Sequence, residues 1–269
     1  MKQLLLMAMT ALLISVGAVW AGPFEDGQAA QKRGDQAGAL KIYRPLAIQG
    51  DSRAQTIIGV MYTEGRGVAK DSAEGAKWFR LAATQGEAIA QSLLGGMYAK
   101  GDGVKQDYAE AAKLYRMAAT QGMPVAQNIL GMLYSDGSGV TQDYVEAVKW
   151  FRLAAAQGFA TAQFQLGMKY LLGKGVAEDH VEAAKWFRQA AAQGNNTALF
   201  NLGVMYANGE GVAKDFVRAR MWISLAALSG DANAAKVNDV LAKQMTPQQI
   251  TEAEKLLREC QQRKIKECD

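Results

Sequence analysis

The sequence predicts an all-α protein: an α/α right-handed superhelix (solenoid) of five 36-residue helix–turn–helix repeats between N- and C-terminal capping helices. Three observations predict it. The same residue types recur every 36 positions, each copy contains one glycine-rich turn, and the chain has 28 Gly but only 4 Pro. With 49% hydrophobic residues there is ample material for a core, and this composition excludes intrinsic disorder.

Several residue types hold the 36-residue period at once, which is the sequence signature of a repeat array. Tyrosines recur at Tyr62, Tyr98, Tyr134, Tyr170 and Tyr206. Glycine, valine and aspartate recur at their own positions with the same spacing. The expected repeats are 51–86, 87–122, 123–158, 159–194 and 195–230, which together fill 51–230. Capping helices are expected at 22–50 and 231–269.

Each repeat is expected to contain a helix A, a tight turn and a helix B. In the second repeat helix A spans about Ala88 to Lys100 and helix B about Tyr108 to Gln121, with GDGVKQD between them. The two glycines permit backbone angles closed to other residues, and the aspartate caps helix B. A glutamate three residues later predicts a capping box in four repeats, whereas Arg218 predicts a weaker cap in the fifth.

Helical spacing places the core on one side of helix A. In the first repeat Ala54, Ile58 and Tyr62 share this side, and Trp78 of helix B fills space beside them. One repeat cannot bury this surface alone, so the repeats must stack on one another.

The flanking segments predict helices that shield the two ends of the stack. At the N-terminal end these are Phe24 to Arg33 and Gln36 to Gln49. At the other end Asp231 to Met245 resembles another helix A. A final helix follows it, with Thr246 as its cap and Pro247 in its first position, and extends towards Glu259.

A longer pattern runs through Ala90 to Leu114 and Ala162 to Trp186, and reads A-x-x-x-L-G-x-x-Y-x-x-G-x-G-V-x-x-D-x-x-x-A-x-x-W. It resembles the Sel-1-like repeat family, a relative of the tetratricopeptide repeats. The resemblance covers 51–230 and implies a non-enzymatic scaffold or adaptor. Some members of the family have carried a penicillin-binding or β-lactamase label, so a β-lactam-binding or cell-wall-directed hydrolase is the alternative. No serine here has the lysine three residues on that this chemistry needs.

The first 21 residues predict a cleavable signal peptide. Lys2 supplies its positive end, Leu4 to Val19 form an apolar run, and Ala21 ends a cleavage site before Gly22. The run is shorter than the roughly 20 residues of a membrane span. We therefore expect a periplasmic or secreted protein that does not span the membrane in its mature form.

The net charge, the glycine turns and the single histidine predict no catalytic residue, no metal and no cofactor. A net charge of +4 lacks the dense basic stripe of a nucleic-acid binder. The Gly-x-Gly turns place an aspartate where a phosphate would have to bind, which argues against phosphate binding. His180 is the only histidine and lies beside the expected helix cap rather than in a three-ligand set.

Cys260 and Cys268 are the only cysteines, and in an exported protein they predict one disulfide. On an unbroken helix eight residues rise about 12 Å, beyond the roughly 7 Å limit for the two Cα atoms. The last helix is therefore expected to break near Arg263 to Lys266.

A partner is expected at the third, seventh and tenth helix A positions, counted from the first alanine, which face away from the predicted core. This stripe changes from small and polar to large and apolar along the chain. Its candidate binding residues are Asn128, Met132, Phe164, Met168, Leu171, Phe200 and Val204. Two interpretations remain open: a groove that binds another protein or peptide, or buried core. The mature protein is expected to be a monomer.

Overall fold

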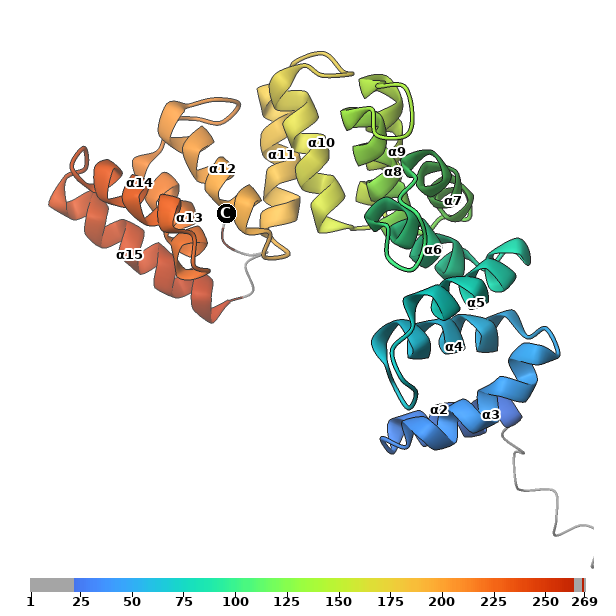
Figure 1. The fold of residues 1–269 in the computed structure, drawn as a ribbon. Coiled ribbons are helices and arrows are strands. Elements are labelled where there is room, and N and C mark those ends of the chain that lie inside the picture. Colours follow the sequence, from blue (N-terminus) through green and yellow to red (C-terminus); the bar gives the residue numbers. More distant parts are fainter. Residues whose placement is uncertain (1–21, 264–267, 269) are drawn as a thin grey trace, which may run out of the picture. The chain divides into compact units, whose positions relative to one another are not determined.

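The computed structural model describes residues 22–263 and 268, and all regular structure in this part of the chain is α-helical (Figure 1). The predicted signal peptide, 1–21, lies outside the described residues. The chain divides into two compact units, Met1–Gln106 and Asp107–Asp269. The expected all-α helical repeat array is confirmed.

Within the first unit, helices that are consecutive in the chain pack against one another. The helices are α2 (Pro23–Lys32), α3 (Gln36–Ile48), α4 (Ser52–Glu64), α5 (Ser72–Thr84) and α6 (Ala88–Lys100). One core cluster lies among α2, α3 and α4, where Tyr43, Ile58 and Met61 are fully buried. Alanines surround them and let the helix backbones approach closely.

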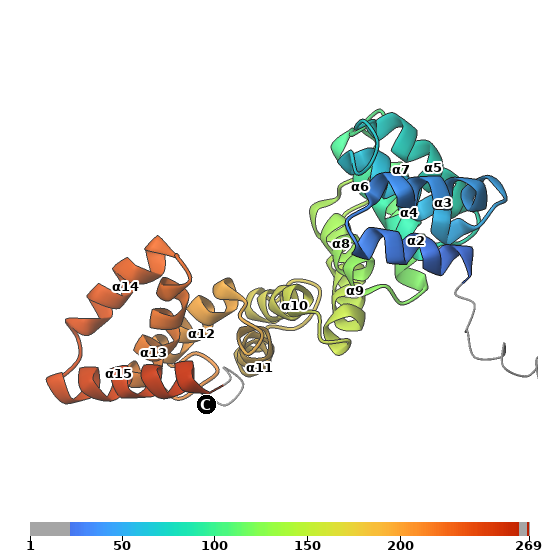
Figure 2. The ribbon, with the colours of Figure 1, turned by 90° about the horizontal axis from the view of Figure 1, so that it is seen from below.

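The second unit continues the same sequential packing and adds one longer-range contact. Its first helices are α7 (Tyr108–Thr120), α8 (Pro124–Asp136), α9 (Tyr144–Ala156), α10 (Ala160–Leu172) and α11 (His180–Ala191). Its last helices are α12 (Asn196–Asn208), α13 (Phe216–Leu228), α14 (Ala232–Ala242) and α15 (Pro247–Gln262). The final helix, α15, turns back to lie along α13 (Figure 2).

The glycine-rich turns have a second purpose beyond ending helix A. Gly65 ends α4 in the left-handed conformation, at φ 74°, and Gly67 follows at φ 71°. A Cβ atom on Gly67 would lie 2.5 Å from the carbonyl carbon of Gln36, the first residue of α3. The second glycine is therefore required because the turn packs directly on the start of the preceding helix B.

Helix B begins at an aspartate cap, as expected, but the predicted capping box is wrong. The Asp71 carboxylate accepts from the Glu74 amide at 2.9 Å. The Asp71 amide, however, donates to the Tyr62 carbonyl at 2.9 Å, so it has no need of the Glu74 side chain. The Glu74 carboxylate instead accepts a hydrogen bond from the Lys77 ammonium at 2.8 Å.

The same arrangement recurs at Asp143, whose amide donates to the Tyr134 carbonyl at 2.9 Å. In the fifth repeat, where a weaker cap is expected, Asp215 still caps the helix. The Arg218 amide donates to Asp215 at 3.0 Å, and the Arg218 guanidinium pairs with the second oxygen of that carboxylate at 2.8 Å. Among the described helices a complete capping box is found at Thr246 and Gln249, at the start of α15.

Candidate functional site

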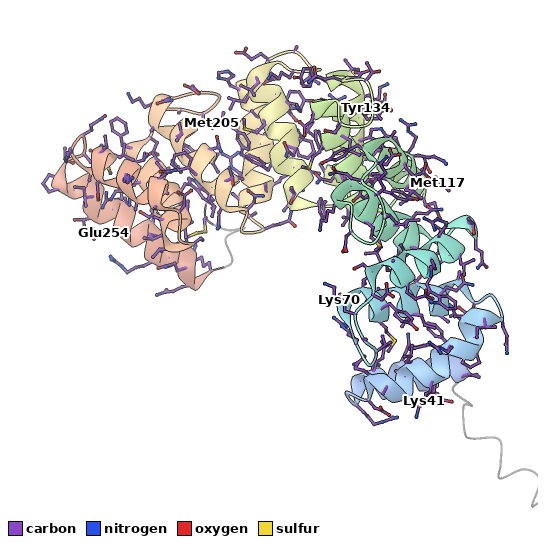
Figure 3. All side chains as sticks on the ribbon, viewed as in Figure 1. Lys41, Lys70, Met117, Tyr134, Met205 and Glu254 are labelled. Carbon is purple, nitrogen blue, oxygen red and sulfur yellow. A yellow bond between two sulfur atoms is a disulfide. The ribbon has the colours of Figure 1, made fainter. Side chains whose placement is uncertain are left out.

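An arginine–tyrosine ladder joins each of the helices α3, α5, α7, α9 and α11 to the helix that follows it. In every rung the arginine guanidinium donates to the hydroxyl of the tyrosine 18 residues further along. The rungs are Arg44–Tyr62 at 2.7 Å, Arg80–Tyr98 at 2.9 Å, Arg152–Tyr170 at 2.8 Å and Arg188–Tyr206 at 2.9 Å. Arg116 makes the same bond to Tyr134, which is labelled in Figure 3. The periodic tyrosines therefore form polar links between repeats in addition to filling space.

A glutamine ladder lies deeper, at the other end of the helices. Gln55, Gln91, Gln127 and Gln163 are buried, and each donates to the carbonyl of an alanine in the preceding helix B. For Gln127 that carbonyl belongs to Ala119, at 3.1 Å. A second glutamine, Gln157, donates to the Gln127 side-chain oxygen at 2.9 Å. Sequence reasoning missed this ladder, although the 36-residue spacing of the buried glutamines was a signal.

The candidate residues of the third repeat lie on α8 and differ in exposure. Asn128 is 5% exposed, whereas Met132 is 38% exposed. The Asn128 amide nitrogen lies 3.6 Å from the Met132 sulfur, but the side-chain oxygen of Asn128 is buried without a hydrogen-bond partner. The stripe therefore presents an unpaired buried acceptor next to an exposed apolar side chain.

The candidate residues of the fourth and fifth repeats are half-buried. Phe164, Met168, Leu171 and Phe200 pack against the core cluster of the second unit, and Val204 lines a cavity described below. The Phe164 ring centroid lies 5.8 Å from that of Phe187 on α11. These side chains are neither free surface nor closed core, so their role in binding stays a prediction.

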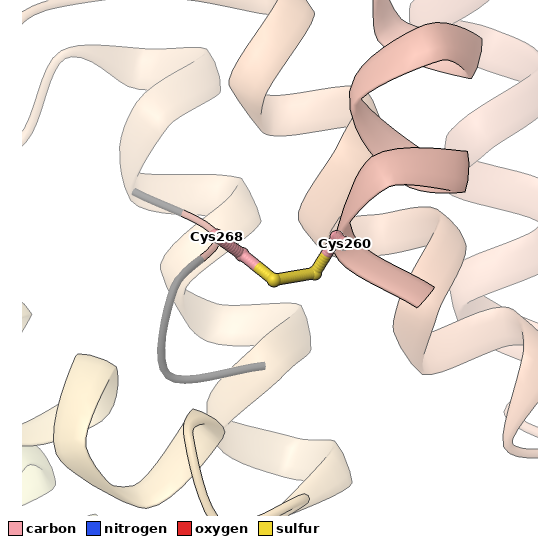
Figure 4. The surroundings of a disulfide bond; sticks show 2 residues. All are labelled: Cys260 and Cys268. Atoms are coloured by element: carbon pink, nitrogen blue, oxygen red, sulfur yellow. A yellow bond between two sulfur atoms is a disulfide. The ribbon is translucent and has the colours of Figure 1, made fainter. Parts of the chain in front are cut away.

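The predicted disulfide between Cys260 and Cys268 is present, and their Cα atoms lie 5.1 Å apart (Figure 4). The helix also breaks as expected, because α15 ends at Gln262 and Arg263 is extended. Cys260 is buried in the core of the second unit. The bond therefore ties the end of the chain to the last helix.

The outer face of α13 differs from that of every other helix B. Met221 and Leu225 are buried there, and α13 is the helix against which α15 packs. The equivalent positions in the third repeat are Lys149 and the exposed Leu153. The almost uninterrupted apolar run MWISLAAL was the signal that a further helix covers this face.

His180 does not gather ligands. Its Nε2 atom lies 3.0 Å from a carboxylate oxygen of Glu178. Across residues 22–263 and 268, no group of three or more His, Cys, Asp and Glu side chains could hold a metal ion. Within the same residues, no helix has the length and apolar character needed to cross a membrane.

Fold and side-chain ladders together define the class of protein: an α-helical repeat array whose repeats are bonded to one another. The chain belongs to the Sel1 repeat family, whose model matches residues 52–87, 88–123, 124–159, 160–195 and 197–231. Proteins of this family are typically scaffolds for protein–protein interaction and generally non-enzymatic.

Two solved structures resemble the chain over most of its length. One is a protective antigen of uropathogenic Escherichia coli with an SLR fold, 34% identical with a TM-score of 0.80. The match covers 88% of this chain and 53% of the antigen, so this chain spans about half of that protein. The other is a Sel1 repeat protein from Oxalobacter formigenes, 33% identical with a TM-score of 0.75, covering 81% of this chain and 87% of that one. No curated protein matches the chain.

Proposed function

We propose that the protein is a non-enzymatic binding scaffold of the periplasm or cell exterior, which engages another protein or peptide along the helix A stripe of repeats three to five. The observation that carries the proposal is the burial and hydrogen bonding of two neighbouring residues in that stripe. Asn128 offers a buried acceptor without a partner, and Met132 beside it is exposed. An unsatisfied buried polar group costs about 1–3 kcal/mol, which a donor on a bound segment would recover if the Asn128 side chain turned towards it.

The apolar part of the stripe supplies the second support. Phe164 and Phe200 hold large, half-buried rings at the same position of consecutive helices A. Aromatic side chains and methionine provide much of the binding energy at protein interfaces. The stripe thus combines a hydrogen-bonding point with apolar anchors in order along the chain.

Export is supported by the predicted signal peptide, removed after Ala21, and by the cysteine usage. Disulfides persist in oxidising compartments such as the periplasm. The Cys260–Cys268 bond fits such a location.

Site-specific crosslinking in the native cell envelope tests the proposal. A photo-reactive residue at Met132 should trap one defined protein. The same residue at Leu153, on helix B and 50% exposed, is the matched control and should not trap it. Equal trapping from both positions, or none from Met132, would contradict binding along the stripe.

The β-lactam alternative has its own test. Incubation with a fluorescent penicillin should leave the protein unlabelled after denaturation, because no serine carries the required lysine. A covalent adduct would establish the hydrolase alternative instead.

A further inference from the structure

A cavity of about 250 Å³ lies among α12, α13 and α14 in the second unit. Its lining is mostly apolar and consists of Val204, Ala207, Asn208, Lys214, Phe216, Ile223, Val237, Val240, Leu241 and Gln244. Apolar cavities of about 150 Å³ hold benzene, and pockets for drug-sized ligands begin near 300 Å³. The cavity therefore has the size for one large side chain.

One of the lining residues, Ile223, stands at a repeat position that is aromatic in the earlier helices B. At the position of Ile223, every earlier helix B carries a buried ring, from Tyr43, Phe79, Tyr115, Phe151 and Phe187. Each of the last two phenylalanine rings lies against a glycine of its own helix A, Gly131 or Gly167, as Ile223 lies against Gly203. Isoleucine keeps this contact but lacks the volume of the ring. On α14, Ala242 also replaces the periodic tyrosine.

The mouth of the cavity carries a positive charge. Lys214 is exposed, and its ammonium lies 4.9 Å from the centroid of the Phe216 ring. No carboxylate of the described residues lies within 4.0 Å of that ammonium. The carboxylate of the nearby Glu210 accepts a hydrogen bond from the Asn208 side-chain amide at 2.9 Å. Glu210 does not line the cavity. Val240 is 56% exposed at the rim, so a side chain can enter from solvent.

We propose that this cavity receives one aromatic side chain of a partner segment, with an adjacent carboxylate of that segment bound by Lys214. The ring would occupy the volume that a phenylalanine or tyrosine fills in every earlier helix B. The proposal rests on the proposed scaffold function and extends its surface, because Val204 belongs both to the stripe and to the cavity lining.

The test uses N-acetylphenylalanine, which has one ring and one carboxylate, titrated into the full mature chain and followed by methyl NMR. Saturable shifts should appear at Ile223, Val240 and Leu241, and N-acetylalanine should produce none. Ile223→Phe restores the ring of the other repeats, fills the cavity and should abolish the shifts. Binding without a ring, or shifts that survive Ile223→Phe, would overturn the proposal.

The charge is tested separately. Lys214→Met should weaken binding of N-acetylphenylalanine about three- to fivefold, as expected for one partly exposed ion pair. Lys70→Met, at the same repeat position in the first repeat, is the matched control and should change nothing. Equal affinity for the acid and for N-acetylphenylalanine amide would exclude the carboxylate contact.

One further variant keeps the outcome clear. If Ile223→Phe does not fold, Val240→Glu places a negative charge at the exposed rim and should weaken the binding of the acid more than that of the amide. The probe titration needs no natural partner. A failure of the cavity proposal therefore appears in the titration, whereas a failure of the scaffold proposal appears only in the crosslinking from Met132.

Discussion

The guanidinium of Arg152 on α9 donates to the hydroxyl oxygen of Tyr170 on α10 at 2.8 Å. The ladder to which this pair belongs connects neighbouring repeats through bonds that a single repeat cannot make. Stability in such an array depends on nearest-neighbour interfaces as well as on each repeat. The polar ladders should therefore contribute measurably to cooperative folding.

Tyr170→Phe should lower the free energy of unfolding by about 0.5–1.5 kcal/mol, because it removes one solvent-exposed hydrogen bond. Tyr115→Phe is the matched control. Tyr115 stands at a position where Phe79, Phe151 and Phe187 occur in other repeats, so its replacement should be neutral. Urea denaturation of both variants measures the difference. Equal effects would show that the arginine–tyrosine hydrogen bond does not stabilise the fold.

Gln127→Leu should cost about 0.5–1.5 kcal/mol, because it removes one of the two hydrogen bonds of the Ala119 carbonyl, which still accepts from the Gly122 amide at 3.0 Å. The fifth repeat already has Leu199 here, with Ser229 in place of the second glutamine. The double variant Gln127→Leu plus Gln157→Ser should therefore lose less than the sum of the two single losses. Strict additivity in this double-mutant cycle would argue against coupling through the glutamine pair.

Lys169 occupies a position that is apolar and buried in the other four repeats, as Met61, Met97, Leu133 and Met205. Burial lowers the pKa of Lys169, the charge of Lys174 lowers it further, and Asp136 opposes the shift. Lys169→Met should stabilise the fold at neutral pH by about 0.5–2 kcal/mol. Lys105→Met, in an exposed turn, is the control.

The gain from Lys169→Met should also depend on pH. Because the folded pKa is lowered, the unfolded chain binds the proton more tightly, and Lys169 costs stability at pH values below its folded pKa. That cost falls as the pH rises towards the ordinary lysine value of 10.5. Urea denaturation at pH 7 and pH 10 should show a smaller gain at the higher pH, and a larger gain there would refute this assignment.

Replacing both cysteines by serine should destabilise the chain by about 2–3 kcal/mol on the loop-entropy model. Hydrogen exchange should rise first in α15, because the disulfide lies at the end of that helix. Thiol labelling of the native, unreduced export product provides the independent check. Two free thiols would show that the bond does not form in the cell.

The parts of the fold that depend on local chemistry were predictable from the sequence. Helix ends followed from left-handed glycines such as Gly65 and from aspartate caps such as Asp71, which act within a few residues. The capping box failed because the Asp71 amide is already satisfied by Tyr62, nine residues earlier in a separate helix. A local motif cannot reveal that competition.

The longer-range features were harder to predict. The two ladders join residues 18 and 30 positions apart, and their geometry requires two stacked helices. The sequence left two interpretations of the stripe open, groove or core, and the structure has Asn128 buried but Met132 exposed. The helical period predicts the direction of a side chain, but the packing of neighbouring repeats determines its exposed fraction.

Binding along the helix A stripe is the central claim, and the double variant Phe164→Ala plus Phe200→Ala tests it most directly. The matched control, Met117→Ala plus Leu153→Ala, removes two exposed apolar side chains from helix B instead. We predict that the first variant loses capture of the protein trapped from Met132 while its melting temperature stays close to that of the control. Retained capture, or lost capture with a large fall in melting temperature, would contradict the account and identify the two phenylalanines as core.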